Sequence, residues 1–235
     1  MLGSQYERAS RDMAVSKPVI VWDVPTRLFH WVLVALIILQ YASGEFGVLP
    51  MEWHFWLGYA TLALIVFRVL WGFAGSQTSR FTDFVRGPRA VANYAVALLN
   101  GRRHADRIGH NPLGGWSVLL LLAVIAVQAV SGLFSSDDLT ETGPLAGRVS
   151  DATVKWMTRI HHIDRWVLLV LIVLHVGAVV MHWAIRHENL VASMLHGKRE
   201  AEGENARIAP AWRALALALA SAAAVWALVS WGGYG

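Results

Sequence analysis

Residues 160–175 read IHHIDRWVLLVLIVLH, an apolar run with histidines at both ends. His161 and His175 are 14 residues apart. In an α-helix this spacing is about 21 Å along the axis and within about 40° of a whole number of turns. We therefore expect both imidazoles to project from one face of one helix, at two different depths.

The chain is apolar enough for such a helix to lie in a membrane. Of its 235 residues, 56% are hydrophobic and 15% are charged, against roughly 25% charged in soluble domains. A membrane-spanning helix needs about 20 mainly apolar residues. Five stretches approach or exceed that length: residues 28–44, 53–74, 112–134, 160–185 and 208–231. The sequence thus predicts an all-α integral membrane protein with five spans in contact with lipid.

Cysteine is absent, whereas there are ten histidines. The lack of cysteine excludes disulfides, thiolate metal sites, iron–sulfur clusters and covalently attached c-type haem. The 20 Lys and Arg residues outnumber the 16 Asp and Glu residues, but no nucleic-acid-binding motif accompanies this excess. We expect no nucleic acid partner, because basic loops are typical of membrane proteins.

Basic residues also predict the orientation of the chain. Fifteen of the twenty lie on one side of the predicted spans, within residues 1–27, 75–111 and 186–213. By the positive-inside rule the N-terminus is cytoplasmic and the C-terminus lies outside. The opposite connections carry the acidic residues Glu45, Glu52, Asp137, Asp138, Glu141 and Asp151. This acidic face either receives a cationic partner or is simply solvated.

Two other segments have a predicted character of their own. Residues 1–17 lack the small-residue cleavage site of a signal peptide, and we expect them to remain attached. Residues 75–111 interleave apolar side chains with arginines, which predicts a short amphipathic helix on the inner membrane surface. No internal repeat is expected.

Six histidines lie in or at the ends of the predicted spans: His30, His54, His161, His162, His175 and His182. Ionisable groups at membrane depth are costly, so each of these asks for a reason. The other four, His104, His110, His187 and His196, lie in basic cytoplasmic segments and are expected to be background.

Depth sorts four of these histidines into two pairs. The span directions bring His30 toward the inner level of His175, and His54 to the outer level of His161. Facing histidines at two depths suit two b-type haems, since each haem takes an axial ligand from either side without a covalent link. Zinc fits less well, because neither pair has a nearby carboxylate within the spans. Histidines that only pack helices together are the simpler alternative.

Two further histidines compete for these roles. His162 is rotated by about 140° from the face of His175. His182 follows His175 by seven residues and lies on the same stripe, at a depth that matches His30 at least as well. Periodicity and depth leave the choice between His175 and His182 open.

Arg68 and Arg27 are candidate partners for haem propionates at the cytoplasmic level. Arg68 follows His54 by 14 residues and shares its helix face. A guanidinium at this depth either pairs with a propionate or snorkels to the interface.

Several motifs, in order, resemble the bacterial dihaem cytochrome b561 family, which includes the cytochrome b subunits of nickel–iron hydrogenases. They are WDVPTRLFHW at 22–31, HFWLGY at 54–59, RVLWGF at 68–73, GHNPLGG at 109–115, and the surroundings of His161 and His175. The resemblance covers roughly residues 21–199. It implies that His30 and His175 hold an inner haem b and that His54 and His161 hold an outer one. It thereby favours His175 over His182.

The expected organisation is a cytoplasmic N-terminal segment at 1–20, a four-helix haem-binding bundle at 21–199, and a linker with a fifth transmembrane helix at 200–235. The resemblance implies electron transfer in the bacterial inner membrane between an extracytoplasmic donor and the quinone pool. The donor is a hydrogenase, another dehydrogenase, a c-type cytochrome, or superoxide in a self-sufficient superoxide:ubiquinone oxidoreductase. Whether the chain is itself an enzyme stays open, and a haem-free bundle that relays protons is a third reading.

Overall fold

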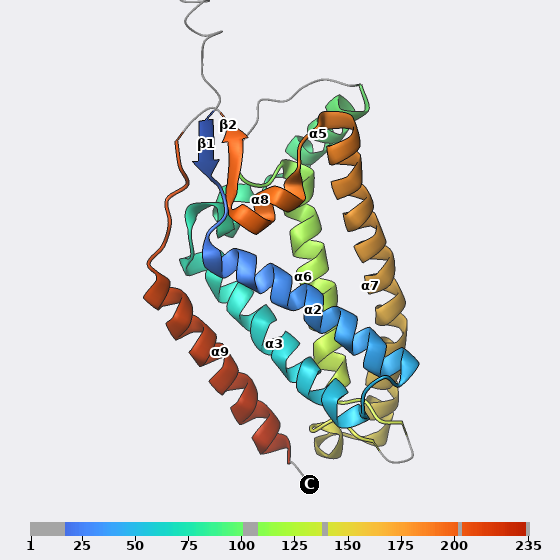
Figure 1. Ribbon diagram of the computed structural model, residues 1–235. Coiled ribbons are helices and arrows are strands. Elements are labelled where there is room, and N and C mark those ends of the chain that lie inside the picture. The colour runs from blue at the N-terminus through green and yellow to red at the C-terminus, as the bar shows by residue number, and fades with distance from the viewer. Residues whose placement is uncertain (1–16, 101–107, 138–140, 202–203, 234–235) are drawn as a thin grey trace, which may run out of the picture.

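A computed structural model describes residues 17–100, 108–137, 141–201 and 204–233. It confirms the predicted all-α membrane class, with five helices long and apolar enough to span a bilayer. They are α2 (Val24–Phe46), α3 (Met51–Ala74), α6 (Pro112–Gly132), α7 (Asp151–Arg186) and α9 (Ala211–Gly232). Figure 1 shows them running between two ends of an elongated bundle.

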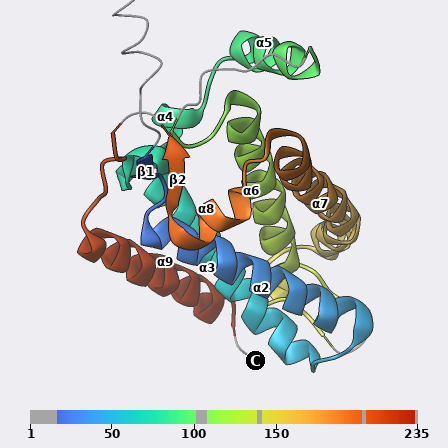
Figure 2. The same ribbon diagram turned by 45° about the horizontal axis from the view of Figure 1, so that its top comes forward.

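The helices α2, α3, α6 and α7 surround a common core, and α9 is added at one edge. Phe29, Ile65, Leu122 and Leu168, one from each of the four helices, are buried together. In Figures 1 and 2, α9 lies along α3, on the side away from α7. The predicted fifth span therefore exists; it packs along α3, and its Ala214 joins the same buried cluster.

Capping explains why two helices begin earlier than the apolar runs indicate. The Asp23 carboxylate accepts a hydrogen bond from the Thr26 amide at 2.8 Å, and Pro25 lies in the first turn of α2. At α7, the Ser150 hydroxyl accepts one from the Thr153 amide at 3.3 Å. Helix α7 thus starts nine residues before the predicted stretch and reaches 36 residues, because its first turns are polar but well capped.

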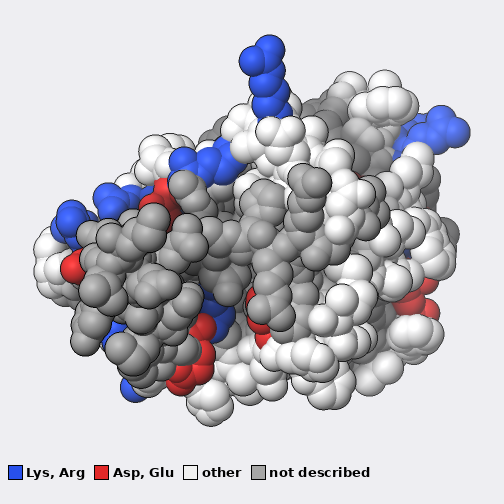
Figure 3. Space-filling view, turned by 90° about the horizontal axis from the view of Figure 1, so that it is seen from above, with Lys and Arg blue, Asp and Glu red and all other residues white. Residues whose placement is uncertain are grey.

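An unpredicted two-stranded ribbon closes one end of the bundle. Strand β1 (Lys17–Ile20) pairs antiparallel with β2 (Lys198–Ala201), with Lys17 opposite Ala201. This ribbon joins the lead-in of α2 to the segment after α8 (Leu190–His196). We call this end of the molecule the ribbon end, and the opposite end, with residues 133–150, the loop end. Figure 3 looks down on the ribbon end and shows Lys and Arg side chains projecting around its rim.

The long connection between α3 and α6 folds at the ribbon end. It contains η1 (Gln77–Ser79), α4 (Phe81–Phe84) and α5 (Pro88–Leu99), while η2 (Ala146–Arg148) lies at the loop end. Helix α5 is the short helix that the sequence predicts here, and its position on a membrane surface stays a prediction. Several charged residues and one histidine whose location was predicted from the sequence lie outside the described part of the chain: Arg8, Arg11, Arg102, Arg103, His104, Arg107 and Asp138.

Candidate functional site

The first histidine pair lies toward the ribbon end and joins α2 to α7. The ring centroids of His30 and His175 are 6.5 Å apart, with the ring planes inclined by 50°. The Nδ1 atom of His30 is buried and has no hydrogen-bond partner among the described residues. The two rings face each other across the bundle. Among the described residues, no hydrogen bond to either ring nitrogen holds the His30 imidazole in place.

The second pair lies toward the loop end and joins α3 to α7. The ring centroids of His54 and His161 are 6.3 Å apart, and their planes are nearly perpendicular at 82°. Both rings line a cavity of about 240 Å³, together with Gly44 and Gly132. This site is therefore hollow as well as lined by two imidazoles.

Helix α7 supplies one histidine to each pair, as the spacing in the sequence predicts. The other two histidines come from α2 and α3, which are neighbours that run in opposite directions. His30 lies near the start of α2 and His54 near the start of α3. Because these two helices run in opposite directions, the two pairs lie near opposite ends of the bundle. Their separation along α7 is about 21 Å.

The donor set at each pair fits a haem. Imidazole nitrogens bind first-row metals at roughly 2 Å, so centroids a little over 6 Å apart leave room for one metal ion between the rings. Among the described residues, no three His, Asp or Glu side chains gather as a metal site. Two imidazoles alone leave a metal's remaining positions open, which suits a macrocycle with four nitrogens rather than a protein-only zinc site.

Glycines next to the loop-end pair leave room for the two histidine rings. A Cβ atom added to Gly44 would lie 3.0 Å from Cε1 of His54, and one added to Gly132 would lie 3.1 Å from Cε1 of His161. By contrast, a Cβ atom at Gly58 or Gly177 would meet nothing within 4 Å. Only the first two glycines are positioned by close contact with the histidines.

The competing histidines take other positions. The His162 ring meets that of His161 edge to face, with centroids 6.4 Å apart, and also lines the loop-end cavity. The Nδ1 atom of His182 lies 2.9 Å from the carbonyl oxygen of Ala178 in its own helix. The structure brings His30 together with His175, and the described ring contacts include none between His30 and His182.

Arg68 lies deep in the ribbon end. Its side chain is 3% exposed, its guanidinium stacks over the rings of Phe81 and Phe84, and its Nη1 atom has no partner among the described residues. The carboxylate of Asp23 contributes a favourable charge nearby. Arg68 is thus a buried cation with an unused donor rather than a snorkelling one.

Arg27 lies at the same end but is bound to α8. Its Nη1 atom donates to the carbonyl oxygen of Leu195 at 2.5 Å, and its Nε atom is buried with no partner in the part of the chain that the structure describes. One donor of this guanidinium therefore stabilises the fold, while another remains available.

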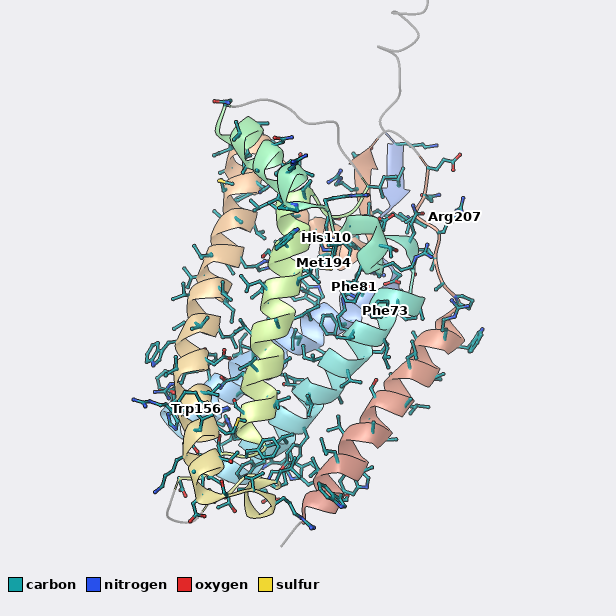
Figure 4. All side chains as sticks on the ribbon, turned by 180° about the vertical axis from the view of Figure 1, so that it is seen from behind. Phe73, Phe81, His110, Trp156, Met194 and Arg207 are labelled. Atoms are coloured by element: carbon teal, nitrogen blue, oxygen red, sulfur yellow. The ribbon has the colours of Figure 1, made fainter. Side chains whose placement is uncertain are left out.

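His110, expected from the sequence to be background, is half-buried and has a buried Nδ1 atom. In Figure 4 it lies inside the ribbon end, in the same region as Met194 and Phe81. Its ring centroid is 4.7 Å from those of both Trp22 and Phe84, and its Nδ1 atom has no partner among the described residues. Burial, together with the nearby charge of Arg68 and the proximity of His175, lowers the pKa of His110 to about 3. Its place in GHNPLGG, directly before a span, was the available signal.

Comparison with known proteins agrees with this geometry. A sequence model of the family described as "Prokaryotic cytochrome b561" matches residues 21–197. A protein of Azotobacter vinelandii is 26% identical over 84% of this chain and 93% of its own length. One of Bradyrhizobium diazoefficiens is 26% identical over 82% and 90%, respectively, and one of Cupriavidus necator is 24% identical over 78% and 87%. All three are named "probable Ni/Fe-hydrogenase B-type cytochrome subunit".

The low pKa of His110 predicts acid sensitivity. In the unfolded protein the His110 imidazole is protonated as the pH falls through about 6.5. In the folded protein it stays neutral down to about pH 3. His110 therefore does not lower the free energy of unfolding above about pH 6.5. Below that pH it lowers the free energy of unfolding by roughly 1.4 kcal/mol per pH unit. His110→Phe, which keeps the aromatic contacts, should flatten the decline of the unfolding temperature of detergent-solubilised protein between about pH 6.5 and 5. The exposed His196, changed to Gln, is the control, and equal slopes in both variants would contradict the assignment.

Proposed function

The chain belongs to the prokaryotic cytochrome b561 family, and we propose that it is a dihaem b-type cytochrome that carries electrons between an extracytoplasmic donor and the quinone pool. The observation that carries this proposal is the sharing of α7 by two facing histidine pairs. Residues 21–199 form the haem-binding unit, and residues 200–235 add a linker and α9. The family is a cytochrome family, which favours haem over a haem-free proton relay.

His30 and His175 hold one haem b in this proposal, and His54 and His161 hold the other. Each haem iron supplies a one-electron redox centre that the protein side chains lack. The four imidazoles fix these centres at two depths, so that one rigid helix sets the distance between them. The surrounding apolar helices exclude water from the path.

Arg68 and Arg27 serve the ribbon-end site as propionate partners. Both have a buried donor that the described fold leaves unused, and a carboxylate is the partner that such donors favour. These groups would hold an anionic edge of the cofactor toward the ribbon end.

The pairing predicts a stoichiometry that can be measured. Purified protein should bind two non-covalent haems, and alanine at His30 or His175 should remove one, while alanine at His54 or His161 removes the other. Pyridine haemochrome analysis gives the haem content, and reduced-minus-oxidised spectra identify which haem is lost. His182→Ala is the control and should retain both. Loss of the same haem from all four variants, or no haem in the wild type, would refute the pairing.

We also propose that the ribbon end faces the cytoplasm of a bacterial cell and the loop end faces outward across the inner membrane. The basic ribbon end and the acidic loop end support this orientation by the positive-inside rule. Residues 1–16 would then be a cytoplasmic segment, and the C-terminus would lie outside.

Orientation can be tested directly, because the chain has no cysteine. Gly87 and Gly147 are exposed at opposite ends, and a side chain at either would meet nothing within 4 Å. In intact spheroplasts, Gly147→Cys should react with a membrane-impermeant maleimide, whereas Gly87→Cys should react only after permeabilisation. The reverse pattern would mean that the chain is inserted the other way.

A protein donor fits the loop end better than superoxide does. The loop-end cavity is lined by Glu45, Asp137 and Glu141, and its arginine, Arg165, is already paired with Glu45. The exposed cations Lys155 and Arg159 are not among its lining residues. Carboxylates at the entrance repel an anion such as superoxide and attract a cationic protein surface. Together with the names of the relatives, this favours an electron-transfer subunit served by a hydrogenase, another dehydrogenase or a c-type cytochrome.

The donor proposal predicts opposite responses to charge changes. A cationic c-type cytochrome should reduce the haems of the isolated chain at a rate that falls with salt, and Asp137→Asn with Glu141→Gln should slow it several-fold. Lys155→Gln with Arg159→Gln is the matched control and should leave the rate unchanged. Stopped-flow absorbance measures both rates, with added quinone as the final acceptor. Fast reduction by superoxide, slowed by the Lys155 and Arg159 changes, would instead identify a superoxide:ubiquinone oxidoreductase.

A further inference from the structure

Two five-residue segments on different helices share one pattern. Residues 40–44 in α2 read QYASG, and residues 128–132 in α6 read QAVSG. This Gln-x-x-Ser-Gly repeat was not expected from the sequence. In the structure, each copy of this pattern lies against a histidine of the following long helix.

The α2 copy contacts His54. The hydroxyl of Ser43 donates to the carbonyl oxygen of Gln40 at 3.0 Å and lies 3.1 Å from Nδ1 of His54. Because the Ser43 hydroxyl hydrogen goes to that carbonyl oxygen, the Ser43 oxygen is the acceptor for Nδ1 of His54. Gly44 completes the contact, because any side chain there would press on the imidazole.

The α6 copy repeats this arrangement around His161. The hydroxyl of Ser131 donates to the carbonyl oxygen of Gln128 at 3.1 Å and lies 3.3 Å from Nδ1 of His161. The same Nδ1 atom lies 2.9 Å from that carbonyl oxygen. Gly132 stands against the ring as Gly44 stands against His54.

An acceptor at Nδ1 decides the tautomer of each ring: the Gln128 carbonyl oxygen at His161 and the Ser43 hydroxyl oxygen at His54. When Nδ1 carries the proton and donates it, Nε2 keeps its lone pair and is the nitrogen available to a metal. The side-chain amide nitrogen of Gln128 lies 3.2 Å from Nε2 of His161, as a donor to that lone pair would. It occupies the metal-facing side of the ring and must turn away when a haem is bound.

We propose that the two Gln-x-x-Ser-Gly segments are a duplicated positioning device for the loop-end haem ligands, with the carbonyl and hydroxyl fixing Nδ1 and the glycine admitting the ring. This inference rests on the proposed dihaem function. It adds Ser43, Gly44, Ser131 and Gly132 as positioning residues of one haem only. At the ribbon end the described structure has no such contact to His30, whose Nδ1 atom is buried without a partner.

The serine test compares Ser43→Ala with Ser131→Ala, alone and combined, in the full-length chain. Changes to partners of metal ligands lower metal affinity by roughly ten- to a hundredfold, so the combined variant should lose the loop-end haem to apomyoglobin that much more readily. The low-temperature electron paramagnetic resonance spectrum and the reduction potential of that haem should change, while those of the ribbon-end haem should not. Ser43→Thr and Ser131→Thr keep the hydroxyl and should restore wild-type values. Ser221→Ala, which removes a buried hydroxyl in α9 bonded to Leu217, is the control.

The glycine test uses a matched set in the same helical environment. Gly44→Ala and Gly132→Ala should displace the histidine rings and alter the same haem, whereas Gly177→Ala, which meets nothing within 4 Å and does not line the loop-end cavity, should not. Two bound haems with unchanged spectra and potentials in all serine and glycine variants would overturn the positioning role and leave the dihaem function standing. Equal changes in both haems would also overturn it, since they would indicate a general loss of structure. A wild type without haem would overturn both proposals.

Discussion

An imidazole ring buried among membrane helices needs a partner for each of its two nitrogens, and this requirement organises the centre of the bundle. Water is excluded at that depth, so an unpaired polar group carries the full cost of its desolvation. At the loop-end pair, the carbonyl oxygen of Gln128 faces Nδ1 of His161 and the hydroxyl of Ser43 faces Nδ1 of His54. The Nε2 atoms are left for a ligand between the rings. The helix positions at the loop end follow, because His54 and His161 each meet an acceptor on one side and the other histidine on the opposite side.

Helix α7 is the element around which this arrangement is built. Its 36 residues exceed what a bilayer needs, so both histidines lie well inside a continuous helix rather than at frayed ends. The two antiparallel hairpins, α2 with α3 and α6 with α7, pack so that His30 and His54 reach the same face of α7 at different levels. Helix α9 lies outside this frame, against α3, and touches neither histidine pair through any described contact.

Sequence patterns predicted the features that depend on one helix at a time. The spacing of His161 and His175, the direction of each span and the five apolar runs led to the pairs that the structure brings together, although their role as haem ligands stays a prediction. Features that depend on contacts between distant segments were missed. Lys17 pairs with Ala201 across most of the chain length, and His110 packs against Trp22 and Phe84. Likewise, a serine and a glycine have no evident role until a histidine of another helix is placed beside them.

The charged groups at the two ends of the bundle have opposite effects on the stability of an added electron. At the ribbon end, the buried guanidinium of Arg68 stabilises negative charge and so favours the reduced form of a nearby redox centre. At the loop end, Asp137 and Glu141 have the opposite effect on the cavity that they line, where Glu45 is paired with Arg165. Histidines that donate Nδ1 to carbonyl oxygens are also more basic ligands, which favour the oxidised form of the metal. Each of these features makes an electron more stable at the ribbon end. The charges of the protein therefore favour movement of an electron from the acidic loop end toward the basic ribbon end, which is the direction that the proposed orientation and the proposed extracytoplasmic donor require.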